Sequence, residues 1–175
     1  IKKRFEEFGI PNTVENRLAY RSMLFSTPGI EEQIGGAILF DETFWQKIGE
    51  TPIPAYLAER GIIPGIKVDV GLEPLFEGSP EKVMKDIPEM DEMFELYKDG
   101  GAQFTKARAV ITIGEGIPTD ECIERNSERL RSYALNAQRR GWLPIVEPEI
   151  LNDGNFDIAR AGEVAKHTLE RVFYL

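Results

Sequence analysis

The fold is decided by one short stretch, Arg139–Glu149, which reads RRGWLPIVEPE. Its glycine follows two basic residues, as at the end of many helices, where glycine adopts a left-handed conformation. The mostly apolar residues that come next predict a buried strand. Two carboxylates, Glu147 and Glu149, then stand two positions apart at the end of that strand. The stretch therefore predicts a helix end, a turn, a buried strand and a charged strand end.

The same order of features occurs elsewhere along the chain. It is found in Glu59–Asp69 (ERGIIPGIKVD) and Lys98–Arg108 (KDGGAQFTKAR), and in weaker form in Gly35–Asp41 (GGAILFD). We therefore expect four parallel strands, near residues 36–41, 62–69, 103–110 and 143–149.

Helices are expected between these strands. The segments concerned are Thr13–Phe25, Ala55–Arg60, Pro80–Tyr97 with a break or kink at Pro88, Pro118–Arg140 and Phe156–Leu175. Alternating strands and helices are typical of βα units on a parallel sheet. A closed (β/α)8 barrel needs eight such units and about 250 residues. A flavodoxin-like open sheet fits 175 residues better on length alone.

Composition excludes several classes of function. The formal net charge of −9 argues against a nucleic-acid partner, which requires a basic surface. With Cys122 and His167 as the only residues of their kinds, a metal site and a histidine-based catalytic triad are both disfavoured. No apolar run approaches the roughly 20 residues that span a bilayer, and no signal peptide is recognisable, so we expect a cytoplasmic protein. The chain starts at Ile1 rather than Met, and we expect a segment upstream of it.

Three pairs of charged residues mark the candidate site. They are Lys67 with Asp69, Lys106 with Arg108, and Glu147 with Glu149. Side chains two apart on a strand point to the same face, so each pair is aimed one way at a strand end. The three cations and three carboxylates sum to zero formal charge. The pattern predicts a site for an anionic, oxygen-rich substrate, and the alternative is an ion-pair network that closes the end of the sheet.

At these residues the sequence resembles the class I fructose-bisphosphate aldolases. The matching segments are Asn12–Arg17 (NTVENR), Gly36–Thr43 (GAILFDET), Gly65–Asp69 (GIKVD), Phe104–Arg108 (FTKAR) and Ile145–Leu151 (IVEPEIL). The resemblance implies an α/β fold, a TIM (β/α)8 barrel present as an incomplete barrel of about four βα units. Residues 1–175 are then expected to form a single domain that covers about strands two to five.

The resemblance also implies a function and roles for residues in the last two expected strands. The family cleaves fructose 1,6-bisphosphate reversibly to dihydroxyacetone phosphate and glyceraldehyde 3-phosphate through a lysine imine, in glycolysis and gluconeogenesis. Glu147 is similar to the family's general acid/base, and Glu149 to its supporting carboxylate. Lys106 and Arg108 are similar to the cations that orient the substrate hydroxyls and the phosphate end.

Earlier residues are implied to contact phosphate. Lys67 is similar to a phosphate contact and Asp69 to a partner that holds the lysines, while Lys3 and Arg4 match a basic pair near the sugar phosphate. The Schiff-base lysine falls outside the chain. No cofactor or metal is implied, and the complete protein is expected to be a homotetramer.

Alternatives remain open beside the resemblance. From the residues alone, Lys106 is the best candidate for an imine lysine, because Arg108 stands two positions away, which would give another Schiff-base sugar-phosphate lyase. The chain can also be a catalytically silent fragment. Ala107 departs from the family, since most animal and plant members have Trp there. We expect it to face the helix layer and to alter packing rather than chemistry.

Overall fold

The structure is a computed structural model in which residues 1–174 are described. The chain divides into two compact units. The first contains Ile1–Ile66 and Tyr97–Gln103, and the second contains Lys67–Leu96 and the residues from Phe104 onward. Each unit contains helices and one pair of parallel strands. The prediction of an α/β fold is confirmed.

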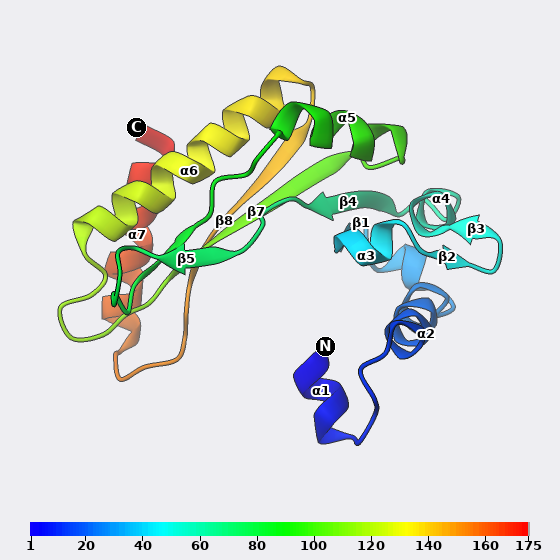
Figure 1. Ribbon diagram of the computed structural model, residues 1–175, viewed down its shortest axis with the longest axis horizontal. Coiled ribbons are helices and arrows are strands. Elements are labelled where there is room, and N and C mark those ends of the chain that lie inside the picture. Colours follow the sequence, from blue (N-terminus) through cyan, green and yellow to red (C-terminus); the bar gives the residue numbers. More distant parts are fainter. Residues whose placement is uncertain (175) are drawn as a thin grey trace. The chain divides into compact units, whose positions relative to one another are not determined.

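The first unit is built around the parallel strands β1 and β4 (Figure 1). Its elements are α1 (Lys2–Glu7), α2 (Val14–Phe25), a 3-10 helix (Ile30–Glu32), β1 (Gly36–Leu39), α3 (Asp41–Phe44), β2 (Lys47–Ile48), β3 (Thr51–Pro52), α4 (Ile53–Ala58) and β4 (Ile63–Lys67), whose last residue belongs to the second unit. β1 and β4 pair from Gly36 opposite Ile63 to Leu39 opposite Ile66. The short strands β2 and β3 form an antiparallel hairpin.

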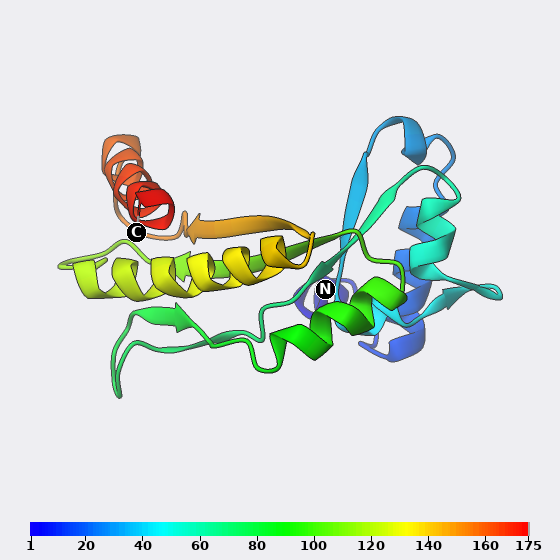
Figure 2. The same ribbon diagram turned by 90° about the horizontal axis from the view of Figure 1, so that it is seen from above.

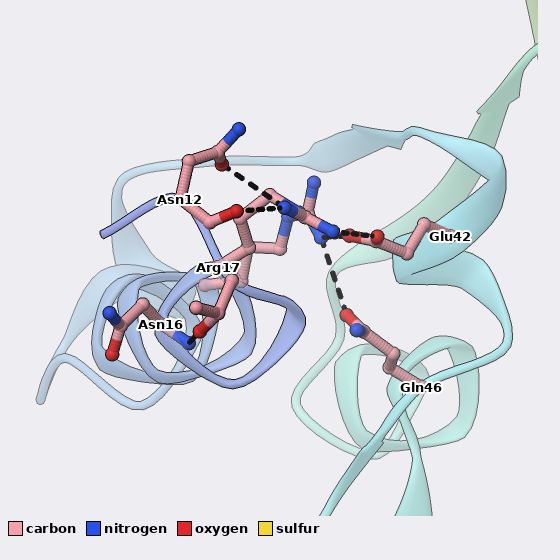
Figure 3. A network of polar contacts seen from close by, with 7 residues as sticks. Asn12, Asn16, Arg17, Glu42 and Gln46 are labelled. Carbon is pink, nitrogen blue, oxygen red and sulfur yellow. Dashed lines mark hydrogen bonds and ion pairs between the residues drawn. The ribbon is translucent and has the colours of Figure 1, made fainter. Parts of the chain in front are cut away.

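An ion-pair network ties α2 to α3 within this unit (Figure 3). Arg17 donates to Glu42 from Nε at 3.0 Å and from Nη2 at 2.5 Å, and Arg21 donates to the same carboxylate at 2.5 Å. Arg17 also donates to the Asn12 carbonyl at 3.0 Å, and Gln46 accepts from Arg21 at 3.3 Å. The hydrogen bonds from Arg17 and then from Arg21 lower the pKa of Glu42 to about 2.

The second unit contains the longer strands and helices. Its elements are β5 (Leu72–Pro74), β6 (Lys82–Met84), α5 (Met90–Asp99), whose last residues belong to the first unit, β7 (Phe104–Ile111), α6 (Asp120–Arg139), β8 (Leu143–Ile150) and α7 (Ile158–Tyr174). β7 and β8 pair in parallel from Phe104 opposite Leu143 to Ile111 opposite Ile150. Figures 1 and 2 show α6 running along these two strands, with α7 beside it.

The predicted turn and strand after α6 are present. Gly141 has a φ of 75° and follows the helix end, as Gly61 does after α4 with a φ of 76°. The N–H of Leu151 donates to the Ile111 carbonyl at 2.9 Å, which sets the odd-numbered N–H groups of β8 toward β7. The nitrogens of Pro144 and Pro148 therefore face away from β7, so these prolines cost no hydrogen bond in this pairing.

The segment Pro80–Tyr97, predicted as a helix with a break or kink at Pro88, differs from that prediction in the part before the proline. Its first part contains the strand β6, which pairs with β5, and the helix α5 begins only at Met90. Side chains of α6 bind the backbone of β6: Asn126 accepts from the Met84 N–H at 2.8 Å and donates to the Lys82 carbonyl at 3.0 Å. These tertiary bonds and the burial of Val83 outweigh the helical spacing of the apolar residues.

The Arg17–Glu42 network predicts acid-sensitive stability. The folded pKa of Glu42, about 2, lies below its ordinary value of 4.5, so the stabilisation is complete above pH 4.5 and is lost as the pH falls toward 2. We expect Glu42→Gln to lower the free energy of unfolding by about 1 kcal/mol at pH 7, with the difference narrowing below pH 4.5. Chemical denaturation across this pH range measures it, with the exposed Glu50→Gln as control. Equal stability of Glu42→Gln and the parent at pH 7 contradicts this account.

Candidate active site

The charged residues singled out in the sequence gather in the second unit. Lys106 and Arg108 lie on β7, and Glu147 and Glu149 lie on β8. Between and beside the two cations, Thr105 and the alanines at 107 and 109 are fully buried. Because side chains alternate along a strand, the two cations share the face opposite to these buried residues. Ala107 therefore faces away from the charged residues, as expected.

The register of the two strands pairs each cation with one carboxylate. Lys106 stands opposite Ile145 and Arg108 stands opposite Glu147. Each cation reaches the carboxylate two residues further along β8, so Lys106 contacts Glu147 and Arg108 contacts Glu149. The Lys106 side chain is only 14% exposed, whereas the other three are between 35% and 39% exposed. A buried ammonium is stable here because its carboxylate partner lies beside it.

Asp69 joins the end of β4 to β7. Its Oδ1 accepts from Lys67 Nζ at 2.5 Å, and its Oδ2 accepts from the Arg108 backbone N–H at 3.1 Å. The neighbouring Val68 N–H donates to the Lys106 carbonyl at 2.9 Å. The Asp69 side chain is 5% exposed, so its charge is compensated almost entirely by these two donors. Spacing in the sequence predicted the Lys67–Asp69 pair but not the backbone contact, because no residue pattern reports a bond to a main-chain N–H.

This arrangement suits an anionic substrate with hydroxyl groups. Three cations and three carboxylates lie on β7, on β8 and at the end of β4 with the segment that follows it, and their formal charges cancel. An incoming phosphate can take over a cation from its carboxylate, and a carboxylate released in this way can accept a proton and later return it. The arrangement is therefore suited to anion binding together with proton transfer.

Other residues considered in the sequence lie on helices. Lys3 and Arg4 are exposed residues of α1, in the first unit. Cys122 is buried, and burial raises the pKa of its thiol to about 12, which makes it unreactive. The Nε2 atom of His167, on α7, lies 3.2 Å from the Asp120 Oδ1 atom. Within residues 1–174, no three His, Cys, Asp or Glu side chains are arranged to hold a metal ion.

Comparisons with known proteins identify the family of the chain. The family model for fructose-bisphosphate aldolase class-I matches residues 1–175. The chain belongs to the class I fructose-bisphosphate aldolase family. Its resemblance to that family is thereby confirmed, and members of the family are lyases.

Individual class I aldolases match nearly the whole chain. A probable class 1 aldolase from Xanthomonas campestris is 48% identical over 99% of the chain, which covers 52% of that protein. The aldolase of Drosophila melanogaster is 42% identical over 98% of the chain, which covers 48% of that protein. The chain thus spans about half the length of the curated relatives it matches.

A solved aldolase structure shares the fold. The aldolase from Plasmodium falciparum, crystallised with TRAP and a small molecule inhibitor, is 41% identical with a TM-score of 0.94 over 99% of this chain. This chain covers 51% of that one. The prediction of a partial TIM barrel is confirmed by this likeness.

No helix among residues 1–174 is long and apolar enough to cross a membrane.

The buried position of Asp69 gives a test of the site's construction. Asp69→Asn keeps the side-chain shape but leaves Lys67 Nζ beside a neutral amide and weakens the acceptor for the Arg108 N–H. We expect the free energy of unfolding to fall by about 2 kcal/mol or more. The Asp91 carboxylate, which pairs with Arg140, is 71% exposed, so Asp91→Asn should lower the free energy of unfolding by less than about 1 kcal/mol. If denaturant titrations show equal losses of unfolding free energy in the two variants, the contacts of Asp69 do not stabilise the site in this way.

Proposed function

We propose that this chain is the middle part of a class I fructose-bisphosphate aldolase. The complete protein cleaves fructose 1,6-bisphosphate reversibly to dihydroxyacetone phosphate and glyceraldehyde 3-phosphate, a step of glycolysis and gluconeogenesis. The contact between Lys106 and Glu147 is the observation that carries the proposal. It joins a cation for a substrate oxygen to a carboxylate for proton transfer, inside a family of aldolases.

Carbon–carbon cleavage next to a ketone needs an electron sink, which a lysine imine supplies. We assign the imine to a lysine outside residues 1–175. Forming it requires proton transfer during carbinolamine formation and dehydration, and Glu147 performs this transfer. Glu149 supports it by holding Arg108, its ion-pair partner.

The cations divide the binding of the substrate. Lys106 and Arg108 orient the substrate hydroxyls and one phosphate. Lys67 contacts phosphate, and Asp69 holds the Lys67 side chain in place. Lys3 and Arg4 bind near the sugar phosphate. We further propose that residues 1–175 belong to one domain of a cytoplasmic homotetramer.

Lys106 is the alternative imine lysine, and its surroundings argue against that role. Its ammonium lies against the Glu147 carboxylate and is mostly buried. An ammonium held in this way cannot attack a carbonyl carbon until the pair separates and the proton leaves. A cation that orients oxygen atoms needs neither change.

Residues 1–175 alone should not cleave fructose 1,6-bisphosphate, because the imine lysine is outside them. Purified chain is mixed with the substrate, triose phosphate release is measured, and borohydride reduction followed by peptide mass spectrometry locates any trapped imine. We expect no turnover and no trapped lysine. Robust turnover with an adduct on Lys106 would replace this proposal with the alternative Schiff-base lyase.

In the complete chain, Glu147→Gln should lower kcat about 10²–10⁴-fold, because a positioned general acid/base is lost. Glu163→Gln on α7, whose carboxylate is 71% exposed, serves as the matched control and should keep the parent rate. Both rates come from coupled assays of triose phosphate release at saturating substrate. If Glu147→Gln stays within twofold of the control, Glu147 is not the acid/base.

A further inference from the structure

A buried pair of hydroxyl groups lies behind the charged face of β7. The hydroxyl of Tyr133, on α6, is 2.7 Å from the Thr105 Oγ1 atom on β7. Tyr133 is 1% exposed and Thr105 is 0% exposed, so neither hydroxyl exchanges this bond for water. Burial raises the pKa of Tyr133 above its ordinary value, which keeps the hydroxyl neutral and able to donate.

Thr105 directly precedes Lys106 in the chain, so their side chains point to opposite faces of β7. A contact from α6 to Thr105 therefore acts on the backbone that carries Lys106 without touching the site. The alanines at 107 and 109 on the same buried face make no polar contact. Thr105 is thus the residue through which a polar group of α6 holds this part of β7.

The helix that carries this hydroxyl, α6, packs against β8 as well as against β7. Ile145 is the register partner of Lys106, and Glu147 follows it two residues later. α6 thereby contacts both strands, and the Tyr133 hydroxyl ties it to β7 at the residue next to Lys106.

We propose that Tyr133 is a positioning residue that holds Lys106 and Glu147 in contact from the far side of the sheet. The pair is diagonal, since Lys106 reaches past its register partner to a carboxylate two positions on. Sliding or splaying of β8 relative to β7 separates these two groups directly. A hydroxyl that ties β7 to a helix packed on both strands opposes that movement.

The kinetic part of the proposal rests on the proposed aldolase function, and a second measurement does not. In the complete chain, Tyr133→Phe should lower kcat for fructose 1,6-bisphosphate about tenfold with KM little changed, because the acid/base is displaced while most binding contacts remain. Thr105→Val should give the same loss. Thr105→Ser, which keeps the hydroxyl, should restore the parent kcat.

The second measurement is the reactivity of two lysines in the same proteins. Acetic anhydride labelling, read by mass spectrometry, gives the acetylation rate of Lys106 relative to Lys67. Lys67 is the internal reference because its partner Asp69 is not on β8. We expect this ratio to rise several-fold in Tyr133→Phe and Thr105→Val, as Lys106 leaves Glu147. General loosening of the fold would raise both rates and leave the ratio unchanged.

Tyr97→Phe is the matched control variant. It removes another largely buried tyrosine hydroxyl, whose partner at 2.8 Å is Asp41 rather than a group of β7 or β8. It should leave both the ratio and kcat at parent values. If Tyr133→Phe does not fold, Thr105→Val decides the question alone.

The outcomes separate the two proposals. An unchanged Lys106 to Lys67 ratio in Thr105→Val overturns the positioning role, whatever the enzyme's activity. If the ratio rises in these variants while the complete parent chain has no aldolase activity, the positioning role stands and the proposed function is overturned. A Tyr97→Phe ratio as high as that of Tyr133→Phe also overturns the role, since any buried hydroxyl would then serve.

Discussion

The parallel register of β7 and β8 is the constraint on which the site depends. It places Arg108 opposite Glu147 and thereby sets both cation–carboxylate contacts, each to a residue two positions further along β8. A shift of one residue would turn the carboxylates to the other face of the sheet, against α6. The apolar packing of α6 on the opposite face excludes that shift, since unpaired charges cannot be buried there at reasonable cost. Packing on one face therefore determines chemistry on the other.

Charge cancellation explains how so many ionised groups fit within one small area. Lys106 and Asp69 are nearly buried, and each has an oppositely charged partner in direct contact. Such pairs add little stability over apolar packing, and removing one member is costly. Their arrangement is thus better suited to an exchange of ion-pair partners than to stabilising the fold. A phosphate can replace a carboxylate as the partner of a cation, so that the cation is not left unpaired.

Much of this arrangement can be predicted from the sequence. A glycine after a helix, an apolar strand and charges two apart are local signals, and β7 and β8 follow them within one residue at each end. The segment Pro80–Tyr97 could not be predicted in the same way. Its apolar residues have helical spacing. The residue that holds its first part as the strand β6 is Asn126, which lies far along the chain and binds the β6 backbone. The contact of Asp69 with the Arg108 N–H could not be predicted either, since a main-chain partner far along the chain leaves no mark on the local residue pattern.

The small residues of β7 connect these observations. With alanine at 107 and 109, the middle of the buried face of β7 offers little bulk to α6, and the polar contact at Thr105 is made by a tyrosine long enough to reach it. A large side chain at position 107 would occupy the space between strand and helix and would hold β7 by packing. The alanine at 107 cannot hold β7 in this way, so neighbouring contacts do. One of them is the hydrogen bond between the Tyr133 hydroxyl and Thr105, which is directional. If Tyr133 has the positioning role proposed for it, the alanine at 107 makes the position of Lys106 more dependent on the Tyr133 hydroxyl than a bulky side chain there would.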